Sequence, residues 1–298
     1  MRVAVFVTMQ NYWNYTALAC KKFEEYTPIE VELHLIDDCS LEPESLQWLD
    51  RMKENPRWRI WRHDKPTGLT YGWNEALQYC IDHSLDIVGI MNNDIAVGQN
   101  WFAALKRCFE LDSKIGLAGP LSNNSGHQPR QFILRRDNPT PALGKHTAEE
   151  VADYRAVNDV CNELEKWCDE TQRHVDELPF ANGFMFLLRG DTVRDVGLFN
   201  PQNRNAGNED EYQVRMRSKG WKSCCSLETF VWHAKDVTLH RGSKSPGGIR
   251  PRLGDGPLEV PRNSMNQLAH IASYAEENAL GPIQRDEALF LLALVRVL

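Results

Sequence analysis

Short apolar runs and longer segments with apolar positions at helical spacing alternate over the first 120 residues. Runs rich in Val, Ile and Leu are typical of strands buried on both faces, and spacings of three and four are typical of amphipathic helices. This alternation predicts right-handed βαβ units and a mostly parallel, Rossmann-like sheet with flanking helices. The predicted strands are 2–8, 31–36, 58–62, 86–91 and 115–119, and the predicted helices are 14–26, 41–55, 68–83 and 100–111.

The pattern becomes more polar and less regular after residue 120. Loop-forming residues dominate first, and a Gly-, Pro- and Arg-rich stretch with little periodicity comes later. Between and after these stretches, further helices and strands are predicted, ending in a C-terminal helical extension. The predicted helices are 147–173, 191–196, 208–219, 263–277 and 284–298, and the predicted strands are 180–189 and 222–233. The two irregular stretches are predicted to be loops at 120–141 and 241–261.

Composition narrows the class of protein. The chain has 298 residues, a net charge of −7 and a pI of about 5.8, so it has no overall basic footprint for nucleic acid. Two local stretches, 130–136 and 241–262, are modestly basic. The eight cysteines lack Cys-x-x-Cys or zinc spacing, which favours reduced thiols.

Neither a signal peptide nor a membrane-spanning run is predicted. The first residues lack a long apolar core, and no stretch approaches about 18 consecutive apolar residues. We therefore expect a soluble, cytoplasmic protein. The apolar segment 288–298 lacks an interleaved basic face, so we expect it to dock on the body or on a second copy in a homodimer rather than on a membrane.

Carboxylates follow two of the predicted strands. Asp37 and Asp38 end the strand 31–36, and Asn92-Asn93-Asp94 ends the strand 86–91. Because parallel strands end at one edge of the sheet, these groups predict a nucleotide-plus-metal site there. The alternative for both motifs is a structural one, since Asp and Asn also cap helices and form turns.

A glycine-containing segment opens the predicted helix 68–83. Gly68 permits close approach of the backbone to a ligand, and a helix N-terminus favours anions. Asn74 lies one turn later, where it could face a base or the metal-side carboxylates. The segment matches neither a Walker loop nor Gly-x-Gly-x-x-Gly, so by itself it is weak evidence for a nucleotide-binding site.

Two further acidic and imidazole groups come late in the chain. Glu209-Asp210-Glu211 opens a helix, which indicates either favourable charge in a first turn or a general base. His233 follows an apolar run and is either a packed residue or a metal ligand together with Asp94.

The order of these motifs resembles that of family 2 glycosyltransferases of GT-A fold. The resemblance covers roughly residues 1–240 and is carried by Ile36–Ser40, Met91–Asp94, Asn182–Arg189, Gly197–Asn200 and Asn208–Tyr212. It implies a domain at 1–240, divided into a nucleotide-sugar-binding half (1–120) and an acceptor and catalytic half (121–240). Residues 241–298 would then form a lid and C-terminal helices.

The resemblance also implies a role for each site residue. Asp210, with Glu209, is the expected catalytic base, and Asp94 with His233 is expected to hold Mn²⁺ or Mg²⁺. Asn92 stands at the first position of the Asp-x-Asp motif, as in rhamnosyltransferase-like members. The expected nucleotide-sugar-binding residues are Thr8, Asp37, Asp38, Gly68, Asn74, Asn92, Asn93 and Gly183.

These roles describe an inverting hexosyl- or deoxyhexosyltransferase. We expect a UDP- or dTDP-sugar as donor and a saccharide of a surface polymer as acceptor. Transfer to a hydroxylated base in DNA stays open as an alternative. In that case the two basic stretches would contact the DNA phosphates. A sugar-nucleotide-binding module without turnover also stays open, because Asn92 replaces an acidic ligand. A nucleotidyltransferase is disfavoured, because residues 8–15 contain Asn and aromatic residues instead of a basic glycine-rich loop.

Overall fold

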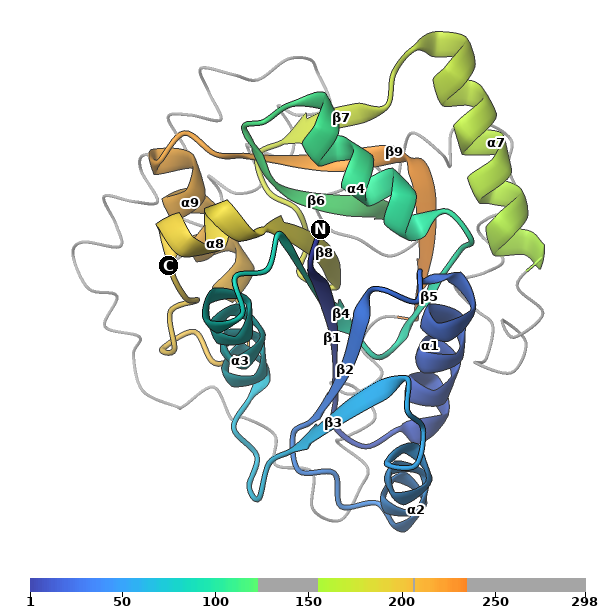
Figure 1. The fold of residues 1–298 in the computed structure, drawn as a ribbon, viewed down its shortest axis with the longest axis vertical. Coiled ribbons are helices and arrows are strands. Elements are labelled where there is room, and N and C mark those ends of the chain that lie inside the picture. Colours follow the sequence, from blue (N-terminus) through green and yellow to red (C-terminus); the bar gives the residue numbers. More distant parts are fainter. Residues whose placement is uncertain (123–154, 206, 235–298) are drawn as a thin grey trace, which may run out of the picture. The chain divides into compact units, whose positions relative to one another are not determined.

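The computed structural model describes residues 1–122, 155–205 and 207–234, which all belong to one unit of the chain (Figure 1). Its strands are β1 Val3–Met9, β2 Glu32–Asp37, β3 Trp58–Arg62, β4 Ile87–Asn92, β5 Ile95–Val97, β6 Ile115–Ser122, β7 Val175–Leu178, β8 Met185–Arg189 and β9 Lys222–His233. Its helices are α1 Trp13–Tyr26, α2 Pro43–Met52, α3 Leu69–Asp82, α4 Trp101–Leu111, α7 Arg155–Thr171, α8 Gly190–Val196 and α9 Asn208–Ser218.

The strands form one sheet in the order β3-β2-β1-β4-β8-β6-β9-β5, and β7 also pairs with β9. The strands β3, β2, β1 and β4 are parallel, which confirms the predicted βαβ order. β8 is antiparallel to both β4 and β6, so the sheet is mixed beyond this point. The predicted Rossmann-like α/β architecture with flanking helices is therefore confirmed.

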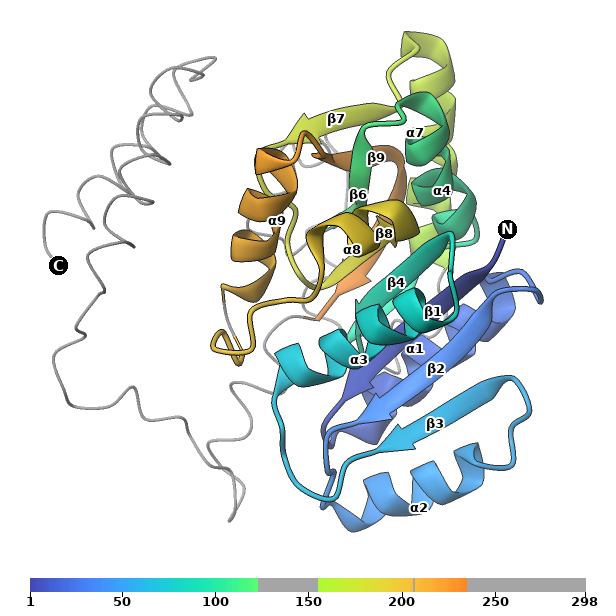
Figure 2. The ribbon, with the colours of Figure 1, turned by 60° about the vertical axis from the view of Figure 1, so that its left-hand side comes forward.

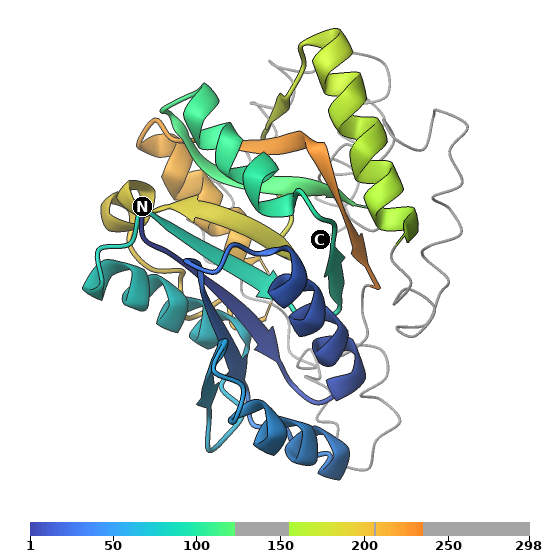
Figure 3. The same cartoon turned by 45° about the vertical axis from the view of Figure 1, so that its right-hand side comes forward.

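Helices cover both faces of the sheet because the strands are apolar on both sides. Along β1, Ala4 and Phe6 belong to one buried cluster, whereas Val5 and Val7 belong to the other. Figure 2 brings forward α3, α8 and α9 on the first face, and Figure 3 brings forward α1, α2 and α4 on the second. α7 packs on β9 at the far end of the sheet. β1 thus contributes to two cores, as its continuous apolar sequence predicts.

The structure adds two short strands that the apolar pattern did not predict. β5 has only three residues and follows directly after Asp94, and β7 has the mixed sequence Val-Asp-Glu-Leu. Both strands pair antiparallel with β9. The run predicted as a strand at 180–189 is shorter, because only β8 pairs within the sheet and its first residues form a loop.

A bulge in β9 turns its last residues toward β5. The register with β6 moves from Pro120 opposite Ser226 to Leu121 opposite Phe230, so β9 has three extra residues at this point. The amide of Asn100 holds the bulge by donating to the carbonyl oxygen of Glu228 at 2.8 Å. Beyond the bulge, β9 continues to His233.

Several predictions fall outside the described residues. These are most of the loop at 120–141, the loop at 241–261 and the helices at 263–277 and 284–298. The predicted division at residue 120 falls inside β6, so one sheet runs through both halves. All eight cysteines are free thiols, as expected. Within the described ranges, no helix combines the length and the apolar character that a membrane span requires.

Candidate functional site

The ends of three parallel strands bring the predicted donor-side residues to one edge of the sheet. In the register of β1, Thr8 lies opposite Asn92 of β4, and Met9 lies opposite Asp37 of β2. Thr8 is buried, and its hydroxyl donates to the carbonyl oxygen of Met91 at 3.4 Å. The parallel pairing thus places the Asp37-Asp38 and Asn92–Asp94 motifs at neighbouring strand ends.

Asp94 and His233, the two predicted metal ligands, lie side by side. Nε2 of His233 is 3.5 Å from Oδ1 of Asp94, and both side chains are more than nine-tenths buried. The pairing of β5 with β9 creates this contact, because Ile95, the residue after Asp94, lies opposite His233. The separation is longer than a usual hydrogen bond, yet both atoms could reach one divalent ion at about 2.1 Å.

The donor set of this pair suits a divalent cation whose other ligands come from a bound molecule. The described residues contain no cluster of three or more His, Cys, Asp and Glu side chains that could hold a metal. One carboxylate and one imidazole leave several coordination positions for the oxygens of a diphosphate. The imidazole favours Mn²⁺ over Mg²⁺, because Mg²⁺ prefers oxygen ligands.

The loop before β8 connects this pair to the start of α9. The ring of Phe184 stacks on His233 with centroids 4.8 Å apart. The backbone carbonyl oxygen of Phe184 accepts from the backbone N–H of Asn92 at 2.8 Å. One residue earlier, the amide of Gly183 donates to Oε1 of Glu209 at 3.3 Å. The acidic first turn of α9 therefore approaches the Asp94–His233 pair through two consecutive residues of one loop.

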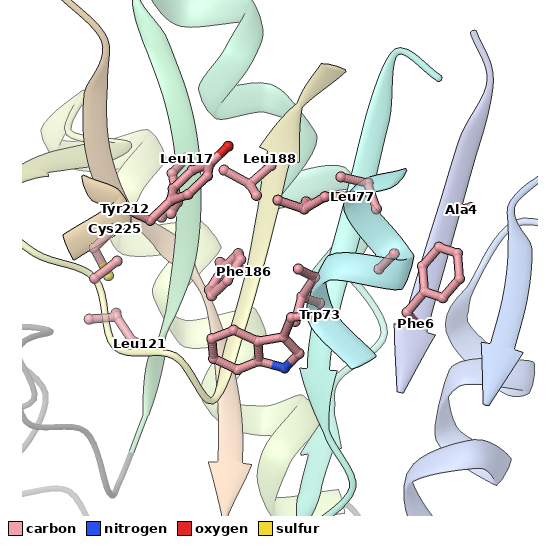
Figure 4. Packing of buried hydrophobic residues seen from close by; sticks show 14 of the residues in the cluster. Ala4, Phe6, Trp73, Leu77, Leu117, Leu121, Phe186, Leu188, Tyr212 and Cys225 are labelled. Carbon is pink, nitrogen blue, oxygen red and sulfur yellow. The ribbon is translucent and has the colours of Figure 1, made fainter. Parts of the chain in front are cut away.

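Gly183 makes this approach possible because it has no side chain. A Cβ atom at this position would lie 2.8 Å from Cη2 of Trp73 and 3.0 Å from Cδ of Glu209. Figure 4 shows Trp73 of α3 lying over Phe186 of β8, and their ring centroids are 5.7 Å apart in an edge-on arrangement. The structure thus gives Gly183 a packing role between Trp73 and Glu209.

Gln213 clamps α9 to the same loop, and the sequence analysis did not identify it. Its fully buried amide accepts from the backbone N–H of Ala181 at 2.7 Å and donates to the carbonyl oxygen of Ala181 at 2.8 Å. It also donates to the carbonyl oxygen of Glu209 at 3.1 Å. A buried Gln between Tyr212 and Met216 on the inner face of the helix is the signal that could have revealed this clamp.

Asn208 and Thr70 join the starts of α9 and α3. The buried amide of Asn208 donates to Oγ1 of Thr70 at 3.0 Å, and that hydroxyl donates in turn to the carbonyl oxygen of Asn203. Asn208 stands directly before Glu209-Asp210, so this bond contributes to placing the acidic turn. No sequence pattern indicated the contact, because the two residues meet only in the folded chain.

The carboxylate of Asp37 is used entirely within the protein. It is fully buried and accepts from Nη1 of Arg62 at 2.5 Å and from the amide and the hydroxyl of Ser40. These partners close the turn after β2. These bonds support the turn-forming role of Asp37, and its contact with a nucleoside stays a prediction.

Asp38 is partly exposed and organises the loop between β3 and α3. Its Oδ1 accepts from Nδ1 of His63 at 2.9 Å and from the amide and the hydroxyl of Thr67, both at 2.7 Å. Its Oδ2 accepts from the amide of Gly68 at 2.9 Å. Burial would raise the pKa of Asp38, but these hydrogen bonds outweigh it and hold the pKa below its usual value. Asp38 remains a predicted nucleoside ligand, with Oδ2 its less occupied atom.

The N–H groups at the start of α3, the predicted anion site, donate to groups of the protein. The amide of Gly68 donates to Asp38, that of Leu69 to the side chain of Asn205 at 3.1 Å, and that of Thr70 to the carbonyl oxygen of Arg204 at 3.1 Å. The first N–H groups of the helix are thus satisfied by the protein itself. Gly68 is required for another reason, because its φ is +96° and a Cβ would meet Arg204.

The side-chain amides of Asn74 and Asn93 also make hydrogen bonds within the protein, and their ligand contacts stay predictions. The side chain of Asn74 donates to the carbonyl oxygen of Phe199 at 3.0 Å and accepts from its amide at 2.8 Å. Asn93 is buried and donates to Oγ1 of Thr16 in α1 at 2.8 Å, which anchors the turn before Asp94. The side chain of Asn92 is only half-buried at the end of β4.

The comparison with protein families decides the identity of the chain. The model described as glycosyl transferase family 2 matches residues 4–156, more than half of the sequence. This chain belongs to glycosyl transferase family 2. The matched range contains the ends of β1, β2 and β4, whereas the acidic turn of α9 and His233 lie beyond it. No curated protein sequence matches the chain.

Solved structures share the fold of this family 2 chain at low sequence identity. The crystal structure of GalNAc-T7 with UDP, GalNAc and Mn²⁺ has a TM-score of 0.56 at 16% identity and covers 78% of this chain. The mannosyltransferase PcManGT from Pyrobaculum calidifontis, in complex with GDP-Man and Mn²⁺, has a TM-score of 0.54 at 14% identity and covers 98%. TarS 1-349 of S. aureus has a TM-score of 0.50 at 12% identity and covers 79%.

The family 2 chain covers only part of these proteins. It spans 44% of the GalNAc-T7 chain, 69% of PcManGT and 61% of TarS 1-349. At this identity the likeness establishes the fold, and it confirms the GT-A architecture that the motif order implied. The roles of the individual side chains therefore rest on the geometry described above.

Proposed function

We propose that this chain transfers a sugar from a nucleoside-diphosphate sugar to an acceptor hydroxyl, with inversion at the anomeric carbon. The observation that carries the proposal is the contact path from Asp94 and His233 through Phe184 and Gly183 to Glu209. It gathers a metal-binding pair and an acidic helix start at the edge where nucleotide ligands bind in open α/β sheets. Family membership supports the reaction class.

Asp210 is the proposed general base. It follows Glu209 in the first turn of α9, which Gln213 and Asn208 hold in place, and it is half-buried rather than closed off. Its carboxylate takes the proton of the acceptor hydroxyl while the acceptor oxygen forms its bond to the anomeric carbon. The bond from that carbon to the phosphate oxygen breaks, and the nucleoside diphosphate leaves with the electron pair. One base without a covalent intermediate predicts inversion.

Asp94 and His233 are the proposed holders of a divalent cation, and Asp38 is the proposed ligand of the nucleoside. When bound, the cation would supply positive charge beside the leaving diphosphate. The solved structures of GalNAc-T7 and PcManGT hold Mn²⁺ together with UDP or GDP-Man, which supports a similar cofactor and a nucleoside-diphosphate donor here. We propose a UDP- or dTDP-sugar, including deoxyhexoses because of Asn92, and we add GDP-sugars to the test.

The acceptor is proposed to be a saccharide. Within the half that the resemblance assigns to the acceptor, residues 121–240, the segment 155–178 forms α7 and β7. The basic stretches 130–136 and 241–262 lie outside the described residues. Transfer to a hydroxylated DNA base is therefore tested as an alternative acceptor rather than proposed.

A donor screen tests the reaction. Purified protein is incubated with Mn²⁺ or Mg²⁺ and UDP-, dTDP- or GDP-sugars, and release of nucleoside diphosphate is measured with saccharides or hydroxymethylated DNA as acceptor. We expect metal-dependent release from one donor, loss in Asp94→Ala and Asp210→Asn, and retention in Asp50→Asn, an exposed carboxylate of α2. Nuclear magnetic resonance of the product then reports the anomeric configuration. Nucleotide binding without release from any donor would favour a binding module instead.

A further inference from the structure

His63 lies between two carboxylates that belong to different elements of the fold. Its Nδ1 is 2.9 Å from Oδ1 of Asp38, at the end of β2, and its Nε2 is 2.8 Å from Oε2 of Glu75 in α3. The imidazole side chain is only 10% exposed, so water does not replace these partners readily. Both ring nitrogens therefore face acceptors at hydrogen-bond distance.

Only the protonated ring satisfies this arrangement. An imidazolium ion donates from both nitrogens, whereas a neutral ring points one lone pair at a carboxylate. Burial would lower the pKa of His63, but the hydrogen bonds and charges of Asp38 and Glu75 outweigh it and raise the pKa above its usual value.

The other groups around His63 are consistent with a positive charge on the ring. The hydroxyl of Thr67 is 3.0 Å from Nδ1, and the ring of Tyr71 lies edge-on with centroids 5.2 Å apart. The neighbouring cation Arg62 pairs with Asp37, and Arg204 donates to the carbonyl oxygens before Gly68. Among the described residues of β2, β3, α3 and the loop, the charged groups that contact His63 are thus two carboxylates, those of Asp38 and Glu75.

The bridge controls the geometry of Asp38. The same carboxylate accepts from the amides of Thr67 and Gly68, so one side chain ties the turn after β2 to the whole loop before α3. Glu75 supplies the fixed point on the helix. If the ring loses its proton, one of its two bonds to a carboxylate is lost and the Asp38 turn loosens.

We propose that His63, as an imidazolium ion, is a positioning residue for donor binding: its bridge between Asp38 and Glu75 holds Asp38 and residues 63–68 in the arrangement that receives the nucleoside. The inference rests on the proposed function. It assigns to His63 no contact with the sugar or the acceptor. It predicts that donor affinity, rather than the rate of the chemical step, depends on the protonation of His63.

Two measurements on the full chain test the proposal. The first is a nuclear magnetic resonance titration of the histidine side chains without nucleotide, in wild type and Glu75→Gln. The second is isothermal titration with UDP, dTDP and GDP in the presence of Mn²⁺ between pH 5.5 and 8.5. Both use His63→Gln and the matched control His83→Gln, at the other end of α3, where the ring stacks on Tyr79 at 3.8 Å. Thermal unfolding at each pH reports whether the variants are folded.

We expect the pKa of His63 to lie above the usual histidine value in wild type and to be lower in Glu75→Gln. The dissociation constant of the nucleotide should rise about tenfold as the pH passes through this value, because a charge-assisted hydrogen bond is lost. Relative to wild type, this rise should be absent in His63→Gln, shifted to lower pH in Glu75→Gln and unchanged in His83→Gln. The turnover number at saturating donor should change little between the variants.

Three results would overturn the proposal. One is the same pH dependence of nucleotide affinity in wild type and in His63→Gln. Another is a titration of His63 that does not move in Glu75→Gln, a variant that keeps the Asp38 contact and serves if His63→Gln fails to fold. The third is a doubly protonated His63 in a protein that binds none of the three nucleotides, which would refute the proposed function and the positioning role with it.

Discussion

The turn after β2 and the Asp94–His233 pair are both carboxylate motifs at strand ends, but the fold uses them differently. In the turn, Asp37 accepts three hydrogen bonds from Arg62 and Ser40 and is fully buried. Across the sheet, the carboxylate of Asp94 faces His233 at 3.5 Å and makes no other ion pair or hydrogen bond with a described residue.

The difference separates structural carboxylates from those available to a ligand. A buried carboxylate whose lone pairs are filled by protein donors stabilises the fold and has little capacity left for a ligand. A carboxylate that is buried beside an imidazole without a short hydrogen bond has an incomplete set of partners, which a cation can complete. Substitutions in the two motifs should therefore have opposite effects on stability and on activity.

The largest effect is expected on activity in Asp94→Ala. Loss of the electrostatic support of the leaving diphosphate should lower the turnover number by about 10²–10³-fold, and the unfolding free energy should change little because few protein contacts are lost. Activity assays with Mn²⁺ and urea unfolding measure both quantities. Chelation of the metal should reproduce the loss in wild type and add nothing in the variant. A variant as active as wild type would refute the assignment.

Asp37→Ala should show the opposite behaviour. Removal of this carboxylate leaves the guanidinium of Arg62 and the Ser40 groups without their acceptor, which should lower the unfolding free energy by roughly 3 kcal/mol. Urea unfolding measures the change. Asp50→Ala, at an exposed carboxylate that pairs with Lys53, is the control and should have little effect. Equal stability of the two variants would contradict the structural role of Asp37.

Gln213→Leu should affect both quantities to a smaller extent. The substitution removes the acceptor of the Ala181 amide and the donor to its carbonyl oxygen, so the unfolding free energy should fall by about 2 kcal/mol. The loop at Gly183 should also shift relative to Glu209, which should lower the turnover number more than the donor affinity. Gln78→Leu is the control, because Gln78 is exposed and, among the described residues, its side chain bonds Asp82 alone. An unchanged Gln213→Leu variant would show that the clamp is dispensable.

The smallest effect is expected for the contribution of Asp38 to the unfolding free energy at low pH. The folded pKa of Asp38 is lowered, so the folded chain holds this proton less tightly than the unfolded chain. Its contribution is present above the ordinary pKa and is lost as the pH falls through the folded value. Urea unfolding between pH 2.5 and 5 should show this loss in wild type, a smaller loss in Thr67→Val and none attributable to Asp38 in Asp38→Asn. The pKa of His63 is raised, so its contribution to the unfolding free energy should be lost as the pH rises through the folded pKa.

The sequence predicted the parallel half of the fold well because its apolar runs are continuous. All five strands and four helices predicted before residue 120 are present, with ends that differ by a few residues. β5 and β7 escaped prediction, since three or four residues carry too little periodicity to be recognised. The antiparallel position of β8 between β4 and β6 could not be predicted either, because an apolar run looks the same in a parallel and in an antiparallel strand.

The sequence predicted which residues meet at the sheet edge, but it did not predict their individual side-chain partners. Asp94 and His233 were expected to share a site, and the structure places them 3.5 Å apart. Asn74 and Gly68 were expected to face a ligand, yet Phe199 and the loop around Arg204 occupy their polar groups. A sequence shows which groups can bind, but not which donors and acceptors the folded chain brings to them.

The sequence by itself determined the α/β class, the order of the first strands and the family, because these depend on local periodicity and on motifs spaced along the chain. The tertiary structure decided which carboxylates find several hydrogen-bond donors within the protein and which do not. The bulge in β9 and the short strand β5 bring His233 to Asp94, and α3 brings Glu75 to His63. These contacts join residues far apart in the chain, so their energies depend on packing and hydrogen bonds that exist only after folding.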